Sequence, residues 1–432
     1  MNNSEAIGIV GMGYVGLPLA MQFCQVGVRV LGIDVDLDKV SKLNAGESYI
    51  LHIASEGIKE QRSSGRFEAT TDFARVGDCS AVIICVPTPL GEGRTPDLSY
   101  VLATGRSIAP HLRQGTLVVL ESTTYPGTTD SELRESLEQG SGMVAGRDFH
   151  LAFSPEREDP GNPDSKVREI PKVVGGLTPA CLDKAMALYG KAIRTLVPVA
   201  NCRVAEAVKL TENIFRAVNI AMVNELKGVY EAMDIDVWDV IAAAKTKPFG
   251  FMPFYPGPGL GGHCIPIDPF YLSWKARQHG QETRFIELAG EVNSAMPARV
   301  VNKVLSVLVA GGLSVIGARV LLVGIAYKSN VDDDRESPGY VLWQLLEERG
   351  AVVSYHDPHV PVIRPSREHS HLAGRASVEL TAEELAGHDV VLVATHHAAV
   401  DWALIAQHAV RVVDTRNALA TQMQGLPHYF KA

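Results

Sequence analysis

The sequence is poor in cysteine, and the few cysteines it has are not spaced for pairing. Six cysteines occur among 432 residues, and none of them belongs to a CxxC pair. Disulfide frameworks and structural zinc sites need grouped cysteines, so we expect neither, and we predict no metal site. Five cysteines fall on apolar segments that suit helices or strands and are interpreted as packing residues: Cys24, Cys79, Cys85, Cys181 and Cys202.

The sequence also lacks a targeting segment and a long hydrophobic run. The amino terminus, MNNSEAIGIVGMGYVGL, has no basic region followed by an apolar stretch and a cleavage site. Apolar runs such as Val82 to Val86 and Val320 to Ile325 end far short of the roughly 20 residues that span a bilayer. We therefore expect a cytoplasmic protein that does not enter a membrane.

Positive charge is not in excess. The formal net charge is -9, which argues against a protein that binds nucleic-acid phosphates or anionic membranes. Hydrophobic residues make up 46% of the chain and charged residues 21%, as in an ordinary globular protein. A chain of 432 residues is too long for one hydrophobic core, so we expect two large domains.

The first part of the chain has the pattern of an α/β domain. Four apolar runs have the length and flanks of buried strands: 6–10, 28–33, 80–86 and 116–121. Residues 17–26 have helical apolar spacing, and helix-compatible stretches also precede the later runs. Strands that alternate with helices predict a parallel sheet built from βαβ units, and we assign this domain to residues 1–200.

A helical segment and a second α/β domain follow. The apolar spacing predicts a long helix over 203–233, and a loop rich in Pro and Gly covers 247–269. We assign residues 201–310 to this central segment and 311–432 to the second domain, whose strands are expected at 319–324, 352–356, 388–395 and 410–414. The predicted fold is therefore two Rossmann-like, doubly wound parallel-sheet domains joined by a helical segment.

A glycine motif lies between the first strand and the first helix. Gly11, Gly13 and Gly16 have G-x-G-x-x-G spacing, with Tyr14 and Val15 inside the loop. In this position such glycines permit a tight turn and close approach of a pyrophosphate to the helix amino terminus. The first turn of the second domain, from Gly324 to Lys328, lacks this triplet, so that domain is expected to bind a different ligand.

An acidic residue at the end of the second strand indicates which dinucleotide binds. Asp34 can accept hydrogen bonds from ribose hydroxyls and would repel a 2′-phosphate, which favours NAD over NADP. Lys39 could reach a cofactor phosphate or ribose, and a solvated surface lysine is an equal alternative. Thr88, next to Pro87, and Thr123 follow strand ends, where open α/β sheets bind their ligands.

One cysteine has a different setting from the others. Cys264 lies in Gly259-Leu-Gly-Gly-His-Cys-Ile-Pro-Ile-Asp268, where glycines such as Gly261 allow backbone to pack around a ligand. A thiolate nucleophile needs a polar or electropositive setting. An isolated cysteine would be interpreted as a packing residue, but the glycine-rich loop and Asp268 favour a nucleophile.

The sequence resembles the UDP-glucose/GDP-mannose dehydrogenase family along its whole length. The resemblance rests on these segments, in order: Gly11–Leu17, Val86–Pro89, Ser122–Gly127, Ser154–Glu156, Lys209 with Asn213, the Cys264 loop, and Lys328 with Arg335. LESTTYPGTT, FSPEREDPGN and GPGLGGHCIPIDPFYLSWKAR are most similar to the branch that oxidises UDP-N-acetylglucosamine. UDP-glucose and the galacto and manno N-acetyl isomers are the alternative substrates.

The resemblance implies two oxidations of one carbon, with NAD as the acceptor of both hydrides. Cys264 would capture the intermediate aldehyde as a thiohemiacetal, and oxidation would give a thioester that water hydrolyses. The family makes its products for polysaccharide biosynthesis. Two rival functions are a two-electron hydroxyacid-type dehydrogenase, which needs no nucleophilic cysteine, and a nucleotide-sugar sensor without catalysis.

Further catalytic roles are carried over from the resemblance. Lys209 would stabilise negative charge on the C6 oxygen, and Asn213 lies one helical turn later; an exposed helix lysine is the alternative for Lys209. Glu156 and Asp268 would form the acidic pair that positions or deprotonates a water, with Thr123 helping to hold it. A turn carboxylate and a helix cap are the alternatives for these two acids, and which of them is the base is left open.

The resemblance also implies a substrate site and an assembly. Lys328 and Arg335 would bind the nucleotide-sugar, Arg335 in its own subunit or across a subunit boundary, or else pair with its acidic neighbours. Tyr255 and Phe254 could wall the substrate or simply pack. The segment 248–253 lacks an arginine that the family often has there. A homodimer or higher even-numbered oligomer is expected.

Overall fold

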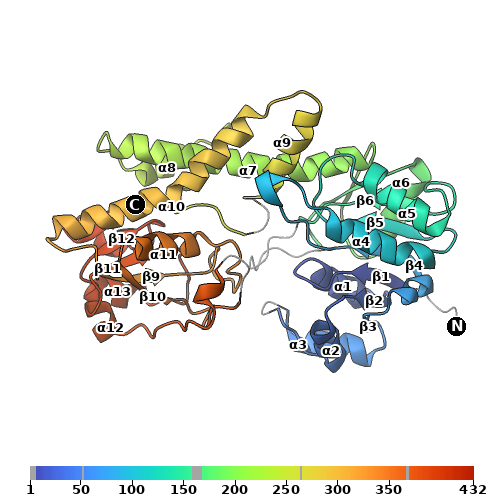
Figure 1. The fold of residues 1–432 in the computed structure, drawn as a ribbon, viewed down its shortest axis with the longest axis horizontal. Coiled ribbons are helices and arrows are strands. Elements are labelled where there is room, and N and C mark those ends of the chain that lie inside the picture. Colours follow the sequence, from blue (N-terminus) through green and yellow to red (C-terminus); the bar gives the residue numbers. More distant parts are fainter. Residues whose placement is uncertain (1–5, 51–52, 158–167, 263–264, 366–368) are drawn as a thin grey trace. The chain divides into compact units, whose positions relative to one another are not determined.

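The structure of the protein is a computed structural model that describes residues 6–50, 53–157, 168–262, 265–365 and 369–432. The chain forms two compact units, Met1–Asn213 with Ile267–Glu282 and Ile214–Pro266 with Thr283–Ala432. Each unit contains a β-sheet with helices packed against it (Figure 1). We refer to them as the first and the second unit.

The first unit is built on an eight-stranded sheet with the order β3-β2-β1-β4-β5-β6-β7-β8. Neighbouring strands are parallel except for β6 and β7, which are antiparallel. The central strands are short apolar runs that are buried throughout except at Ser80, as expected for a sheet covered on both faces. The strands are β1 Ala6–Val10, β2 Val30–Ile33, β3 Phe67–Thr70, β4 Cys79–Ile84, β5 Leu117–Leu120, β6 His150–Phe153, β7 Lys172–Gly176 and β8 Leu196–Val199.

Successive residues of the central strands enter two separate hydrophobic cores, one on each face of this sheet. Ile9 of β1 packs in the core that contains Phe23, whereas Val10 packs in the core that contains Val101. Because side chains alternate along a strand, helices must cover both faces. The helices of this unit are α1 Gly16–Gln25, α2 Leu37–Ala45, α3 Ser55–Ser63, α4 Ser99–Ile108, α5 Arg134–Ser141, α6 Pro179–Tyr189 and α9 Asp268–Gln278.

The second unit contains a five-stranded parallel sheet with the order β10-β9-β11-β12-β13. It is also covered on both faces, since Leu322 and Leu321 of β9 enter different cores. Its strands are β9 Arg319–Val323, β10 Val352–His356, β11 Val390–Val393, β12 Val412–Asp414 and β13 Tyr429–Lys431. The helices that follow β9 in the chain are α11 Pro338–Glu348, α12 Ala382–Ala386, α13 Trp402–His408 and α14 Ala420–Met423.

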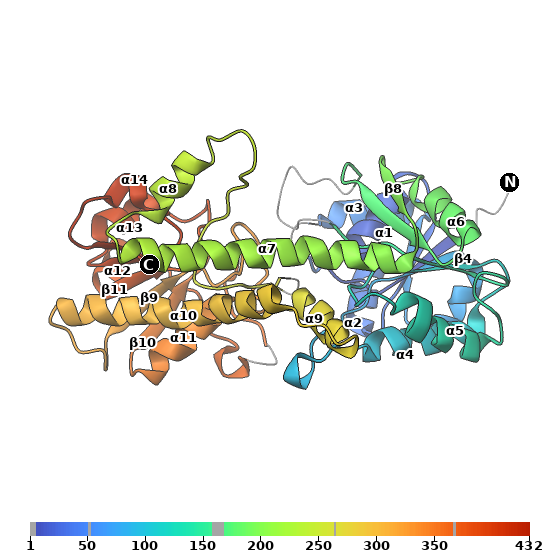
Figure 2. The same ribbon diagram turned by 90° about the horizontal axis from the view of Figure 1, so that it is seen from above.

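Two long helices dominate the middle of the chain. They are α7 Cys202–Glu231, which begins in the first unit and ends in the second, and α10 Arg284–Ala310, with α8 Val237–Ala244 between them. In the second unit α7 and α10 lie side by side (Figure 2), joined by a hydrogen bond from Asn293 Nδ2 to the carbonyl oxygen of Ala217 at 3.1 Å and by the Lys303–Glu231 ion pair. The long helix predicted over 203–233 is confirmed to within two residues at each end.

The α/β fold class, with two sheets and a central helical segment, is confirmed. The predicted parallel sheets are present, and the first one includes a single antiparallel pair among its described strands, β6 with β7. The short strands β3, β6, β7, β8 and β13 were not predicted, since a charged residue, histidine, glycine or proline leaves each of them with at most three consecutive apolar residues. The domain boundaries at residues 200 and 310 stay predictions. In the described part of the chain, no helix is long and apolar enough to cross a membrane.

Leu342 and Val341 provide a test of the core of the second unit. Leu342 on α11 is fully buried, whereas its neighbour Val341 is 40% exposed. Leu342→Ala should lower the free energy of unfolding of this unit by about 2–5 kcal/mol, because it leaves a cavity in a packed core. Chemical denaturation of the two variants checks this, and Val341→Ala, the control, should change stability by less than about 0.5 kcal/mol.

Candidate active site

Two glycines of the loop after β1 pack closely against neighbouring backbone, and the third faces open space. A Cβ on Gly11, whose φ is +92°, would lie 2.4 Å from the carbonyl oxygen of Cys85, and one on Gly16 would lie 1.9 Å from the carbonyl oxygen of Gly11. A Cβ on Gly13 would meet no protein atom within 4 Å. Gly11 and Gly16 are thus required by the fold, while Gly13 leaves open space beside the amino terminus of α1, where the sequence predicts the pyrophosphate. Tyr14 and Val15, inside the loop, pack against the first core.

Asp34 holds the glycine loop to the end of β2. Its Oδ2 accepts a hydrogen bond from Met12 N at 2.8 Å, and its Oδ1 accepts one from Asp36 N at 3.0 Å. Lys39 Nζ lies 3.8 Å from Asp34 Oδ2, so this lysine is adjacent to the acid rather than turned away from it. A carboxylate has about four acceptor sites, so Asp34 keeps capacity for ribose hydroxyls.

The ends of β4 and β5 are joined by one side chain. Ser122 Oγ accepts a hydrogen bond from Val86 N at 2.9 Å and donates one to Val86 O at 2.7 Å. This brings the two segments that carry Thr88 and Thr123 together at the carboxyl edge of the sheet. Thr88 is buried and its carbonyl oxygen accepts a hydrogen bond from Tyr271 Oη at 2.5 Å, while Pro87 is exposed.

Four of the residues given catalytic roles are connected in pairs within the first unit. Lys209 Nζ donates to the carbonyl oxygen of Glu156 at 2.6 Å. One turn further along α7, Asn213 Nδ2 donates to Asp268 Oδ2. Lys209 is only 8% exposed, which rules out an exposed helix lysine, and Asn213 and Asp268 are buried. Asp268 starts α9 and does not cap it, because the cap residue is Ile267.

A buried row of polar groups, Tyr189–Glu121–Lys172–Glu156, was not predicted. Lys172 Nζ lies 3.1 Å from Glu121 Oε2 and 3.9 Å from Glu156 Oε2, and Tyr189 Oη donates to Glu121 Oε1. Burial opposes the charge on Lys172, but the two carboxylates outweigh it and raise the pKa of the lysine above its usual value. The only signal in the sequence is a lysine at the head of the apolar run KVVGG.

The five described cysteines are all buried. Burial raises the pKa of the Cys24 thiol to about 12 and that of Cys79 to about 11. It also raises the pKa of Cys85 and of Cys202 well above the usual range. These settings suit packing residues. The sixth, Cys264, lies outside the described residues, so its assignment as nucleophile stays a prediction.

The residues assigned to the substrate are divided between the units: Glu156, Lys209 and Asn213, predicted to bind it as well as to act in catalysis, lie on the first, and the others lie on the second. Lys328 follows β9 in a loop held by Asp357, whose Oδ2 accepts hydrogen bonds from Ile325 N at 2.7 Å and Ala326 N at 2.9 Å. Arg335 forms two hydrogen bonds with the carboxylate of Asp333, at 2.8 and 2.6 Å, as expected from its acidic neighbours.

Tyr255 and Gly261 belong to the long loop of the same unit. The ring of Tyr255 stacks on Trp238 at a centroid distance of 5.7 Å, and Phe254 packs edge-on against Phe215. A Cβ on Gly261 would lie 2.6 Å from Cβ of Tyr327, so this glycine is needed for close packing. Substrate contacts by these residues stay predictions.

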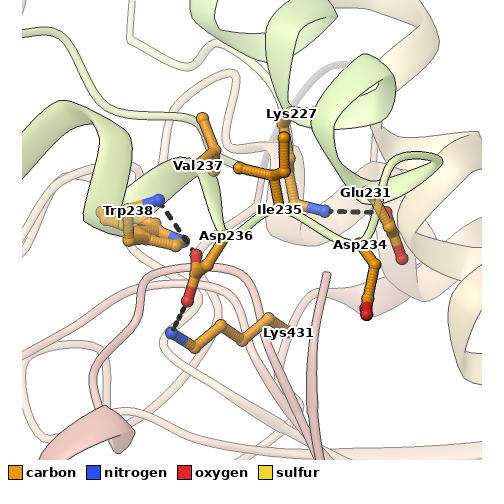
Figure 3. A pocket seen from close by; sticks show the side chains of 8 residues that line it. All are labelled: Lys227, Glu231, Asp234, Ile235, Asp236, Val237, Trp238 and Lys431. Atoms are coloured by element: carbon orange, nitrogen blue, oxygen red, sulfur yellow. Dashed lines mark hydrogen bonds and ion pairs between the residues drawn. The ribbon is translucent and has the colours of Figure 1, made fainter.

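The second unit also has a pocket of about 250 Å³ near the end of α7 (Figure 3). Four of its charged groups form two ion pairs: Lys431 with Asp236, and Lys227 with Glu231 at 3.3 Å. No predicted site residue lines it. The lining residues are Lys227, Glu231, Asp234, Ile235, Asp236, Val237, Trp238 and Lys431.

Comparison with known families accounts for most of the chain. Three models of the UDP-glucose/GDP-mannose dehydrogenase family match in order: the NAD binding domain over residues 5–193, the central domain over 203–295 and the UDP binding domain over 321–421. The first of these contains the glycine loop and Asp34. The prediction of NAD as the cofactor is confirmed.

Individual relatives agree with this family. The chain is 36% identical to a UDP-N-acetyl-D-glucosamine 6-dehydrogenase of Pseudomonas aeruginosa, over 82% of this chain and 83% of the relative. It is 34% identical to a UDP-N-acetyl-D-mannosamine dehydrogenase of Salmonella typhi, over 90% and 93%. Among solved structures it is similar to a UDP-D-ManNAc dehydrogenase from Pyrococcus horikoshii, with a TM-score of 0.88 and 30% identity over 99% of this chain and 98% of the other.

Gly13 and Gly11 allow cofactor binding to be separated from folding. Gly13→Ala should lower the affinity for NAD at least about 10-fold, because a methyl group would occupy the space left for the pyrophosphate. The thermal midpoint should not change. Gly11→Ala, the control, should lower the midpoint, since its Cβ would collide with backbone at positive φ. Titration with NADH fluorescence and thermal unfolding check both, and a Gly13→Ala variant with full affinity would contradict the assigned position.

Proposed function

Because the chain belongs to the UDP-glucose/GDP-mannose dehydrogenase family, we propose that it oxidises the C6 alcohol of a UDP-hexose to a carboxylate, with two equivalents of NAD as hydride acceptors. The observation that supports this most directly is the pairing of Lys209 with Glu156 and of Asn213 with Asp268. It brings a cation and an amide of one helix into contact with the two acidic residues, Lys209 with the backbone of Glu156 and Asn213 with the carboxylate of Asp268, all in the unit that contains the glycine loop.

The first oxidation needs a group that stabilises an alkoxide. When NAD is bound, it accepts a hydride from the C6 carbon. In the proposal, the ammonium of Lys209 stabilises the negative charge that develops on the C6 oxygen as its proton leaves. The hydrogen bond from Lys209 to the Glu156 carbonyl oxygen fixes the position of the ammonium, so little reorganisation is required during the reaction.

The second oxidation needs a covalent intermediate. The thiolate of Cys264 adds to the aldehyde carbon and the carbonyl oxygen takes up a proton, which gives a thiohemiacetal. Loss of a second hydride and of the hydroxyl proton gives a thioester. Water then replaces sulfur on the carbon, so one alcohol, one water and two NAD yield one carboxylate, two NADH and three protons. Cys264 itself lies outside the described residues.

The hydrolysis of the thioester needs a group that accepts a proton from water. Glu156 and Asp268 are the candidates, and Thr123, at the end of β5, is proposed to hold the water. Both acids lie in the first unit beside α7, and each is bonded to a side chain of that helix, Glu156 through its carbonyl oxygen and Asp268 through its carboxylate.

The substrate is proposed to be UDP-N-acetylglucosamine. The sequence blocks of that branch and the 36% identity to a UDP-N-acetyl-D-glucosamine 6-dehydrogenase support this choice. Lys328 and Arg335 are proposed to bind the UDP-sugar, and they lie in the span matched by the UDP binding domain. Tyr255 and Gly261 are proposed to line the sugar site. UDP-glucose and the manno and galacto N-acetyl sugars are the alternatives.

The proposal includes a cytoplasmic homodimer or higher even-numbered oligomer. Phe215, Met222 and Val229 of α7 recur every seven residues and are 47%, 47% and 48% exposed. An apolar stripe with this period on a helix suits pairing with a second helix. Pairing with the copy of α7 in a second subunit would cover the stripe.

The number of NADH formed tests the reaction. The protein should release two NADH for each UDP-sugar consumed, because the thioester route oxidises the carbon twice. Cys264→Ser should lower kcat by at least about 10³-fold while the UDP-sugar still binds. Coupled absorbance and product analysis by mass spectrometry measure this.

Cys24→Ser is the matched control, because this buried thiol donates to the Arg66 carbonyl oxygen and lies in the first core; it should stay active. One NADH per sugar, with accumulating aldehyde, would support a two-electron dehydrogenase instead. Binding of the UDP-sugar without any oxidation would support a sensor.

A panel of sugars tests the substrate. The kcat/KM for UDP-N-acetylglucosamine should exceed those for UDP-glucose and for the galacto and manno N-acetyl isomers by at least about 10-fold, as expected when polar substituents are read by fitted contacts. Steady-state kinetics on the four sugars decide it. A preference for UDP-glucose would overturn the choice.

A further inference from the structure

The carboxylate of Glu156 lies at the open end of the row Tyr189–Glu121–Lys172–Glu156. Exposure of the side chains increases along the last three members, from 0% for Glu121 to 7% for Lys172 and 16% for Glu156. The row therefore begins in the core and ends at the edge of the sheet where the ligand-binding loops lie. Tyr189 and Glu121 hold Lys172 in place, and Lys172 brings its positive charge close to the carboxylate of Glu156, the outermost member of the row.

The direction of β7 explains how a lysine reaches this place. The carboxyl ends of β4, β5 and β6 lie at one edge of the sheet because these strands are parallel. β7 is antiparallel to β6, so it begins at the edge where β6 ends, and Lys172 is its first residue. Glu121 directly follows β5 and Glu156 comes three residues after β6, which brings all three side chains to the same edge.

Both sides of Lys172 are fixed. Tyr189 Oη on α6 bonds to Glu121, and the ammonium of Lys172 lies 5.1 Å from the centre of the Tyr189 ring, at cation–π distance. Lys172 Nζ also donates to the carbonyl oxygen of Pro155 at 3.4 Å. The lysine is thus attached to the residue that immediately precedes Glu156 as well as to the Glu156 carboxylate.

Stability alone does not explain such a pair. In many proteins a buried ion pair stabilises the fold no better than well-packed apolar residues would, because removing two charges from water is costly. A buried ion pair is therefore weak evidence for a stabilising role. This pair is placed where it acts on a carboxylate at the ligand edge.

On this basis, and resting on the proposed function, we propose that Lys172, held by Glu121 and Tyr189, is a positioning residue that holds the Glu156 carboxylate in place as the proton acceptor for thioester hydrolysis. In this step the water oxygen bonds to the thioester carbon and one water proton passes to the Glu156 carboxylate. The carbon–sulfur bond breaks, and its electron pair stays on the Cys264 sulfur. The sugar acid then loses its remaining proton to solvent.

Several other charged or titratable groups face Glu156. Arg157 donates its backbone N–H to Glu156 Oε1 at 2.7 Å, and its guanidinium is paired with Glu212. Lys209 bonds to the Glu156 carbonyl oxygen, and the Cys85 thiol stays neutral because burial raises its pKa well above the usual value. Lys172 contributes a cation on the carboxylate side of Glu156, with its Nζ 3.9 Å from Glu156 Oε2.

The pH dependence of the reaction tests the proposal. The double variant Glu121→Gln with Lys172→Met removes both inner charges of the row together, so that neither is left buried without the other. A cation beside a carboxylate favours its charged form, so without Lys172 the acid limb of the kcat profile should move up by about one pH unit. The kcat at neutral pH should fall about 10-fold or more, while KM for the UDP-sugar changes less than about 3-fold. Enzyme-bound thioester should accumulate in rapid-quench mass spectrometry.

Two further variants keep the test decisive. Lys172→Arg retains the positive charge, so its acid limb should lie at the same pH as that of the unmodified protein. Glu121→Gln alone removes a negative charge that repels Glu156, so the limb should move to lower pH, opposite to the double variant. Lys184→Met is the matched control, because this half-buried lysine of α6 bonds to the Gly115 carbonyl oxygen, away from Glu156. It should not move the limb.

The outcomes separate this inference from the proposed function. If the unmodified protein makes no uronate, or one NADH per sugar, the proposed function fails whatever the variants do. If it makes uronate but the acid limb is the same in all variants, Lys172 is only structural and the inference is overturned. An opposite displacement in Glu121→Gln and the double variant, with rescue by arginine, supports it.

Discussion

Parallel strand pairing is the constraint on which the candidate site depends. Because β1, β2, β4, β5 and β6 run in one direction, everything that follows their carboxyl ends lies at one edge of the first sheet. The hydrogen bonds of Ser122 and Asp34 then tie adjacent strand ends together. The loops that follow these strands are thereby brought into one region: the glycine loop and the loops that contain Asp34, Thr88, Thr123 and Glu156.

The parts of the site that the sequence predicts are those whose geometry is local. The glycine triplet and Asp34 are recognisable because a strand, a turn and a helix follow one another within one βαβ unit. Lys209 and Asn213 are four residues apart on a helix, so their common direction follows from helical periodicity. The two sheets could likewise be predicted because Val- and Ile-rich runs alternate with helices.

The remaining features depend on information that sequence spacing does not contain. Lys172 reaches Glu156 only because β7 is antiparallel, and a four- or five-residue strand does not reveal its direction. Its partner Glu121 precedes it by 51 residues. Arg335 illustrates a second limit: a basic residue among aspartates can pair with a neighbour or bind a ligand, and the bidentate contact with Asp333 describes the protein without its substrate.

The burial of the described cysteines has a consequence for chemical labelling. Thiol reagents react with the thiolate, and burial both hides Cys24, Cys79, Cys85 and Cys202 and keeps them protonated. Cys181 is buried as well and accepts hydrogen bonds through its sulfur. Rapid alkylation of the native protein at neutral pH can therefore be ascribed to Cys264. Its rate, followed with and without a bound sugar nucleotide, reports on that thiol without any need to remove the other five.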